Sequence, residues 1–208
     1  MAFGIYANCM KARTNRWDDH FARQARSENW AARSVYKLEE IDLRFKILKQ
    51  GDRVLDLGCF PGSWSQYALK KVGSPGRVVG VDTRGPLELP HENFTFIKQD
   101  VFDLDPYRLA AESGKVDVVL SDMAPSTTGI RNTDAARSME LALRALEISM
   151  KVLSNRGRMV CKAFEGEDIG RLRNMAAAGF RDLRLLRPTA TRKRSRELYL
   201  IGINFIKS

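Results

Sequence analysis

From residue 53 onward, short apolar runs alternate with amphipathic helical patterns, and this alternation limits the fold more than any other feature of the chain. Strands that are separated by helices form a parallel sheet with helices on both faces. The strands are expected at 53–59, 77–83, 94–100, 116–122, 157–164, 180–186 and 197–205. The helices between them are expected at 63–72, beginning at an N-cap Ser63, at 133–153, closed by the SNRG stretch, and at 167–179, ending at a C-cap glycine. The sequence therefore predicts an α/β fold with a seven-stranded, mostly parallel sheet.

The two ends of the chain depart from this alternation. Only ten residues, 187–196, separate the last two strands. This is few for a parallel crossover, so these strands are expected to form an antiparallel hairpin at the end of the sheet. Residues 17–45 are rich in Ala, Arg and Glu and read as helical. No composition shift marks a domain boundary, so we expect a single domain over 1–208, with an N-terminal basic helical extension at 1–50 and a core at 51–208.

Positive charge is concentrated at the two ends of the chain. The net charge is +10; residues 1–49 carry ten Lys and Arg against six Asp and Glu, residues 180–208 carry eight against two, and residues 50–179 carry 17 of each. A polyanion such as nucleic acid is the natural partner of this distribution. The alternative is a charged surface that only confers solubility.

Cysteine usage and hydropathy indicate the compartment. Cys9, Cys59 and Cys161 are odd in number, lie far apart and form no CxxC pair, so they suggest neither a zinc site nor a disulfide framework. No apolar run approaches the ~18 residues that a membrane span needs. The N-terminal residues lack the pattern of a signal peptide. We therefore expect a soluble protein in the reducing environment of the cytoplasm.

The first strand ends in a glycine loop, DLGCFPGSW at 56–64, which precedes a helix. Such a loop lets a ligand approach the backbone closely. Gly58 and Gly62 are spaced GxxxG rather than GxGxxG, and Pro61 removes an amide donor, which disfavours a pyrophosphate cradle and hence a nicotinamide enzyme. Asp56 would repel a phosphate and favour a cationic ligand.

Three further expected strands end in a carboxylate, those of Asp82, Asp100 and Asp122. In doubly wound folds, ligands bind along the carboxyl ends of the strands, and an acid in the position of Asp82 can hydrogen-bond ribose hydroxyls. Any one of these residues alone could be an ordinary turn aspartate. Together they indicate a ligand site at this edge of the sheet.

Five segments in the expected order resemble the FtsJ-type ribosomal RNA 2′-O-methyltransferases. The resemblance runs from about residue 15 to the end of the chain. The glycine loop alone would indicate only a methyltransferase, and its combination with SDMAP and the lysines is more specific. The segments are RSVYKLEEID, VLDLGCFPGSWSQ, VDVVLSDMAPSTTG, GRMVCKAFEGED and SRELYLIG.

The resemblance implies a catalytic Lys–Asp–Lys–Glu tetrad around the target 2′-hydroxyl, which falls here on Lys37, Asp122, Lys162 and Glu197. Lys37 could instead be a solvated helix lysine, and Glu197 an ordinary acid at the start of a strand. Lys162 lies in an otherwise apolar strand, where a lysine is costly unless it is paired. Asp122 offers the partner, which would explain a carboxylate at that strand end.

The chemistry requires a base, because a ribose hydroxyl is barely ionised at neutral pH and must lose its proton as it attacks the methyl group. We assign this role to Lys162, with Asp122 orienting it and with Lys37 and Glu197 positioning the ribose. Burial and the charge of Lys37 favour the neutral form of Lys162, whereas Asp122 favours the charged form, so the owner of the proton stays open. Alignment of the oxygen with the methyl group contributes alongside the base.

The resemblance also implies S-adenosylmethionine as the cofactor, bound across the strand tips of a Rossmann-like methyltransferase fold, and no metal. Gly62 and Trp64 would shape the loop, Asp56 would lie near the methionine amino group, Asp82 would hold the ribose and Asp100 the adenine amino group. Cys59 and Phe60 depart from the commoner motif, in which small residues are usual. The expected cofactor-binding residues are Asp56, Gly58, Gly62, Trp64, Asp82, Asp100 and Asp122.

The basic ends would flank the tetrad and contact an RNA backbone, through KARTNR at 11–16, RQARSENWAARS at 23–34 and RPTATRKRSR at 187–196. We expect the substrate to be a uridine of large-subunit ribosomal RNA, within the large ribosomal subunit, and the protein to act as a monomer. The tetrad leaves transfer RNA and an mRNA cap open. The basic ends oppose a small-molecule O-methyltransferase, and the complete tetrad opposes a non-catalytic RNA-binding module.

Overall fold

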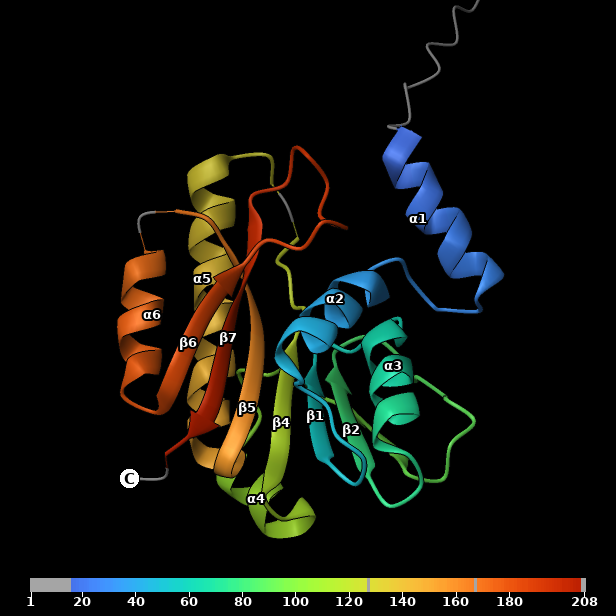
Figure 1. The fold of residues 1–208 in the computed structure, drawn as a ribbon. Coiled ribbons are helices and arrows are strands. Elements are labelled where there is room, and N and C mark those ends of the chain that lie inside the picture. Colours follow the sequence, from blue (N-terminus) through green and yellow to red (C-terminus); the bar gives the residue numbers. More distant parts are fainter. Residues whose placement is uncertain (1–15, 127, 167, 207–208) are drawn as a thin grey trace, which may run out of the picture.

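The computed structural model describes residues 16–126, 128–166 and 168–206, and in this part of the chain seven strands form one sheet in the order β3-β2-β1-β4-β5-β7-β6 (Figure 1). The strands are β1 (Arg53–Leu57), β2 (Arg77–Asp82), β3 (Phe94–Lys98), β4 (Val116–Ser121), β5 (Leu153–Phe164), β6 (Phe180–Leu186) and β7 (Glu197–Phe205). The helices are α1 (Arg16–Ser27), α2 (Val35–Phe45), α3 (Ser63–Val72), α4 (Pro106–Ser113), α5 (Arg131–Val152) and α6 (Ile169–Ala177).

The sheet is parallel from β3 to β5, and β7 runs antiparallel to both of its neighbours, β5 and β6. The expected seven-stranded α/β sheet and the expected C-terminal hairpin are therefore confirmed. The chain builds β1, β2 and β3 outward and then returns to place β4 on the other side of β1. Ligands bind where the strand order reverses in this way, at the carboxyl ends of the strands.

Two apolar layers hold the helices on opposite faces of the sheet. Leu109 of α4, Leu146 of α5 and Leu172 of α6 belong to one buried cluster. Leu38 of α2 and Leu69 of α3 belong to the other. Because α2 is packed into the second layer, the element that carries Lys37 is fixed to the sheet.

The start of α3 differs from the expectation. The helix begins at Ser63 itself, and the N-cap position is taken by Gly62 in the left-handed conformation, with φ of 111°. Ser63 is therefore not the N-cap, and its hydroxyl instead shares a hydrogen bond of 2.9 Å with that of Ser34. The serine that resembled a cap thus joins α3 to the residue preceding α2.

Two further helix ends also differ. Helix α6 ends at Ala177, and Gly179 is not its C-cap, because Ala178 takes that position in a right-handed conformation. A Cβ atom at Gly179 would lie 2.4 Å from Met150 Sδ, so close packing against α5 requires this glycine. Strand β5 starts directly after α5, so the SNRG stretch at 154–157 belongs to the strand.

The sequence pattern missed α4 and overlooked a break in the N-terminal helical region. Asp105 caps α4 by accepting hydrogen bonds from the amides of Tyr107 and Arg108, and proline occupies the first turn. The region expected to be helical at 17–45 divides into α1 and α2. Within the described residues, no helix has the length and apolar character needed to cross a membrane.

Candidate active site

A cleft with a volume of about 880 Å³ lies at the carboxyl ends of β1, β2 and β4. Its lining includes Gly58, Trp64, Asp82, Asp100 and Asp122. Five of the seven expected cofactor-binding residues therefore line one cleft. The other two, Asp56 and Gly62, are buried behind its surface.

Asp122 and Lys162 form an ion pair at one end of this cleft. Lys162 Nζ lies 3.0 Å from Asp122 Oδ1, and the two side chains are only 6% and 18% exposed. The same ammonium donates a hydrogen bond of 2.5 Å to the backbone carbonyl of Asp122. The lysine in the apolar strand β5 is thus paired with the carboxylate that follows β4, as the sequence predicted.

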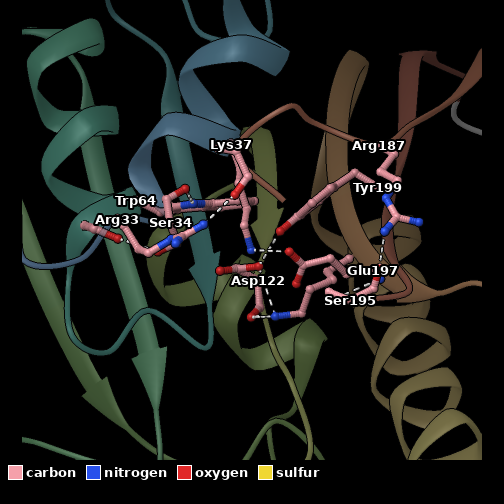
Figure 2. A network of polar contacts seen from close by, with 12 residues as sticks. Arg33, Ser34, Lys37, Trp64, Asp122, Arg187, Ser195, Glu197 and Tyr199 are labelled. Atoms are coloured by element: carbon pink, nitrogen blue, oxygen red, sulfur yellow. Dashed lines mark hydrogen bonds and ion pairs between the residues drawn. The ribbon is translucent and has the colours of Figure 1, made fainter. Parts of the chain in front are cut away.

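Lys37 and Glu197 form a second ion pair beside the first (Figure 2). Lys37 Nζ lies 2.5 Å from Glu197 Oε1, and both side chains are nearly buried, at 11% and 12% exposure. Helix α2 supplies the lysine, and the first residue of β7 supplies the glutamate. All four tetrad positions therefore come together, from segments separated by up to 160 positions in the chain.

Tyr199 is a member of this network that the sequence analysis overlooked. Its hydroxyl donates a hydrogen bond of 2.7 Å to Asp122 Oδ1, and its side chain is fully buried (Figure 2). Lys37 Nζ lies 6.0 Å from the centre of its ring. The available signal was its spacing, because residues two apart in a strand share a face and Tyr199 follows Glu197 by two positions.

The network determines the charge of its members. Burial alone would raise the pKa of Asp122, but the charges of Lys162 and Lys37 and the Tyr199 hydroxyl outweigh it, so this pKa is lowered. Burial and the charge of Asp122 raise the pKa of Tyr199 well above its ordinary value. Asp122 is therefore a fixed anion, and Tyr199 is a hydrogen-bond donor.

The glycine loop is joined to the tetrad through α2. Trp64 Nε1 donates a hydrogen bond of 2.9 Å to the carbonyl of Ser34, immediately before α2 (Figure 2). The Trp64 ring also lies 5.8 Å from that of Tyr199. A shift of the loop would therefore be transmitted to the helix that carries Lys37.

The two loop glycines are required by the protein itself. Gly58 has φ of 75°, and a Cβ atom there would lie 2.4 Å from Met123 Cγ. Gly62 has φ of 111°, and a Cβ atom there would lie 3.1 Å from Leu87 Cδ1. Both positions favour glycine because of backbone conformation and close neighbours.

Asp56 is a buried carboxylate with one incomplete oxygen. Ser65 donates a hydrogen bond of 2.6 Å to Oδ2, whereas the buried Oδ1 has no hydrogen-bond partner in the structure. Burial, together with the charges of Asp122 and Asp82, raises its pKa to about 7. A cationic donor would complete this oxygen and favour its ionised form, so the residue fits the ammonium group of an amino-acid ligand.

Asp82 and Asp100 both line the cleft, but they differ in burial and in hydrogen-bond partners. Asp82 accepts hydrogen bonds from the amides of Phe60 at 3.0 Å and Arg84 at 2.8 Å, and the Arg84 guanidinium lies 4.9 Å from the centre of the Phe60 ring. The phenylalanine that departs from the commoner motif is thus stacked against an arginine. Asp100 is exposed and accepts a hydrogen bond of 3.0 Å from the amide of Phe102, which also lines the cleft.

The loop after Asp122 is held by a carboxylate from α5. Asp134 accepts hydrogen bonds from the amide and hydroxyl of Thr128, both at 2.8 Å, and from the amide of Gly129 at 3.2 Å. Met123 and Pro125, at the start of this loop, line the cleft. Asp134 thus fixes a wall of the site from a distance, a role that the sequence analysis missed.

The basic segment 187–196 is anchored beside α2. Arg33 donates a hydrogen bond of 2.7 Å to the carbonyl of Ala190, and Glu40 accepts two hydrogen bonds of 2.7 Å from Thr189. The basic side chains beyond these anchors are exposed. They are Arg192, Lys193, Arg194 and Arg196. Of the other predicted basic segments, KARTNR at 11–16 falls outside the described residues except for its last position.

Comparisons with known proteins identify relatives of this chain. A family model described as FtsJ-like methyltransferase matches residues 30–205. The Ribosomal RNA large subunit methyltransferase E of Bdellovibrio bacteriovorus is 49% identical over 189 residues, covering 89% of this chain and 96% of that protein. The protein of the same name from Methanothermobacter thermautotrophicus is 42% identical, covering 90% of each chain. A crystal structure of a ribosomal RNA methyltransferase from Plasmodium falciparum superposes with a TM-score of 0.74 at 27% identity, covering 85% of this chain and 98% of that one.

Proposed function

The chain belongs to the FtsJ-like methyltransferase family, and we propose that it transfers a methyl group from S-adenosylmethionine to the 2′-hydroxyl of a uridine in large-subunit ribosomal RNA. The observation that carries the proposal is the pairing of Lys162 with Asp122 and of Lys37 with Glu197 at one end of the cleft. The names of the relatives support ribosomal RNA of the large subunit as the substrate.

The cofactor fits the acidic edge of the cleft. When bound, S-adenosylmethionine supplies an electrophilic methyl group on a positively charged sulfur. Asp56 would accept from its amino group, since Oδ1 is buried without a partner. Gly58 and Trp64 would border it, Asp82 would accept from the ribose hydroxyls, and Asp100 would accept from the adenine amino group. Carboxylates along the cleft favour a cationic ligand over the pyrophosphate of a dinucleotide.

Lys162 acts as the base in this proposal. Asp122 Oδ1 and the Asp122 carbonyl both hold its ammonium, which fixes the direction of the nitrogen. Taking the hydroxyl proton requires the neutral amine, so Lys162 must release a proton before the transfer step. Lys37 and Glu197 position the ribose, and the Tyr199 hydroxyl holds Asp122 in place.

The exposed basic segment 187–196 contacts the RNA backbone. Substitution of Arg192, Lys193 and Arg194 by glutamine together is expected to weaken RNA binding and to reduce the slope of its salt dependence, while the affinity for the cofactor stays unchanged. Filter-binding titrations over a range of salt concentrations measure the slope. An unchanged slope would mean that the segment is only a solvated loop.

The proposed function is tested by mapping ribose methylation in large-subunit ribosomal RNA from a strain that lacks the gene. We expect one 2′-O-methyl group to be missing, to return with the wild-type gene and to stay missing with Lys162→Ala. An unaltered methylation map in the deletion strain would exclude ribosomal RNA as the substrate. We also propose that the protein acts in the cytoplasm as a monomer, on the assembled large ribosomal subunit, without a metal ion.

A further inference from the structure

A second cavity lies on the outer side of α2 and shares no lining residue with the cleft. Its volume is about 520 Å³. Helix α1 contributes Phe21 and Gln24, and segment 187–196 contributes Thr189 and Ala190. The remaining lining residues come from α2, and they are Tyr36, Glu39, Glu40, Leu43 and Arg44. We refer to this cavity as the α2 groove.

The α2 groove is adjacent to the tetrad. Glu40 lines it and follows Lys37 by three residues, which is less than one helical turn and about 4.5 Å along the axis. Glu40 also binds Thr189, so the groove wall includes the segment that leads into β7 and Glu197. In Figure 1, the segment joining β6 to β7 lies above α2, and α1 lies on the outer side of α2. The groove is therefore within reach of an RNA strand whose target ribose lies at the tetrad.

The chemistry of the lining fits a nucleobase. The rings of Phe21 and Tyr36 lie 5.4 Å apart, and the Leu43 side chain is 59% exposed, so part of the wall is apolar or aromatic. Unstacked RNA bases bind on aromatic side chains and are recognised through the hydrogen-bonding groups on their edges. Glu39 provides a carboxylate for that purpose, and Gln24 provides its amide oxygen, since its Nε2 donates a hydrogen bond of 2.8 Å to Glu28.

The charge of the lining does not favour a phosphate group as the occupant. The carboxylates of Glu39 and Glu40 offset the guanidinium of Arg44, so the lining carries no excess of positive charge. A carboxylate instead accepts hydrogen bonds from the amino group of a base such as cytosine. The exposed Arg192, Lys193 and Arg194 lie on the segment that forms one wall, where they can hold the phosphates on either side.

We propose that the α2 groove binds an unstacked base with an exocyclic amino group, from a nucleotide next to the methylated one. The inference rests on the proposed function. It makes the groove a specificity determinant, because a base held there sets which ribose reaches Lys162. The groove thus reads sequence, while the basic segment reads the backbone.

Leu43→Trp fills the groove at an exposed position, and Met175→Trp on α6 is the control, since Met175 is 46% exposed and lines neither cavity. With large ribosomal subunits from the deletion strain, Leu43→Trp is expected to lower kcat/KM for RNA about tenfold, the scale of one stacked base. Its affinity for S-adenosylmethionine, measured by calorimetry, should equal that of the control. Equal kcat/KM in the two variants would overturn the proposal.

A photocrosslinker gives a second, independent measurement. With p-benzoylphenylalanine at position 43, ultraviolet light should crosslink the protein to a nucleotide adjacent to the methylated one, as mapped by reverse transcription. The same group at position 175 should not. A crosslink from position 43 to a ribosomal protein or to a distant nucleotide would overturn the groove proposal. Absence of methylation by the wild-type protein would instead contradict the proposed function, and the crosslink map would still locate the RNA.

Discussion

Two carboxylates at the same edge of the sheet have opposite surroundings. Asp56 lies buried in β1 opposite Leu120 of β4, and the partly buried Asp122 comes directly after the end of β4. Asp122 is held by the Lys162 ammonium and the Tyr199 hydroxyl, and its pKa is lowered. Among the residues that the structure describes, Asp56 accepts a hydrogen bond only from the Ser65 hydroxyl, and burial raises its pKa to about 7.

The two ends of the site therefore differ in whether the protein itself supplies the partners of the carboxylate. At the tetrad end the protein supplies its own cations, so Asp122 stays charged whether or not a ligand is bound. At the glycine-loop end the buried Oδ1 of Asp56 is left without a donor. A buried acceptor without a partner is costly. In the free protein, Asp56 Oδ1 therefore lacks a hydrogen bond that a cationic ligand would supply. The tetrad side chains, in contrast, are already held in position before a ligand binds.

The largest effect is expected from removing the Lys162 ammonium beside Asp122. Lys162→Ala should lower the single-turnover rate of methyl transfer by ~100- to 10,000-fold, the usual cost of losing a general base. The affinity for S-adenosylmethionine should hardly change, since the cofactor would be held mainly at the other end. Single-turnover kinetics at saturating RNA and cofactor give the rate.

Lys162→Arg distinguishes a base from a structural partner. Arginine keeps the positive charge beside Asp122 but does not release its proton at working pH, so it should not restore activity. Substantial activity in this variant would end the assignment of Lys162 as the base. Positioning of the ribose would then be the main source of catalysis.

Asp56→Asn tests whether the buried carboxylate without a second partner binds the cofactor. It should weaken S-adenosylmethionine binding by on the order of ten- to a hundredfold, because hydrogen bonds to charged groups contribute ~1.5–3 kcal/mol. Isothermal calorimetry at pH 8 measures the affinity. The control is the same substitution, Asp103→Asn, at an exposed carboxylate that does not line the cleft. An affinity equal to the wild type would remove Asp56 from the cofactor site.

The stability of the same variant should depend on pH. A pKa raised from 3.8 to about 7 gives the wild type a contribution to stability that is fully present below pH 3.8 and is lost as the pH rises through 7. Asp56→Asn lacks this loss, so its free energy of unfolding should exceed that of the wild type increasingly from pH 4 to pH 8, by up to about 4 kcal/mol. Urea titrations at several pH values test this, and a constant difference would contradict it.

Tyr199→Phe removes one hydrogen bond to Asp122 and leaves the Lys162 ammonium in place. The lost hydrogen bond to Asp122 should lower the single-turnover rate about tenfold, the scale of one hydrogen bond to a charged group. Tyr67→Phe is the matched control, because the Tyr67 hydroxyl donates at 3.0 Å to the buried carboxylate of Asp42, outside the cleft. The control should lose stability and keep the wild-type rate. Equal rates in the two variants would show that Tyr199 has no part in positioning Asp122.

The sequence predicted the sheet well because the strands carry strong local signals. The apolar runs around Val119 and Val160 are buried in the sheet, and the short connection at 187–196 favoured an antiparallel hairpin. Helix ends were less predictable. Gly179 resembles a C-cap, but its role is to make room for Met150 of another helix, and only the tertiary structure supplies that neighbour.

The sequence was sufficient to name the candidate tetrad residues, but the hydrogen bonds that connect them to their neighbours could not be predicted from it. The tetrad residues were identified through a family resemblance, and the structure brings them together as two ion pairs. Asp134 carries no local signal that separates it from an ordinary helix residue, and Tyr199 is marked only by its spacing of two residues from Glu197. Their roles depend on Asp122 and Thr128, which only the fold brings within hydrogen-bond distance.

The smallest effect is expected at Asp134, a carboxylate whose donors are all supplied by the protein. Hydrogen bonds from Thr128 lower its pKa below the ordinary 3.8, so it stays ionised throughout the working range. Asp134→Asn should reduce the single-turnover rate severalfold by loosening the loop behind Asp122, about the effect of one net hydrogen bond. Asp168→Asn is the control, since Asp168 precedes α6 without a side-chain cap bond. The ratio of the two rates should be constant from pH 6 to 9. A ratio that changes with pH would contradict this prediction, because it would mean that Asp134 gains or loses a proton within this range.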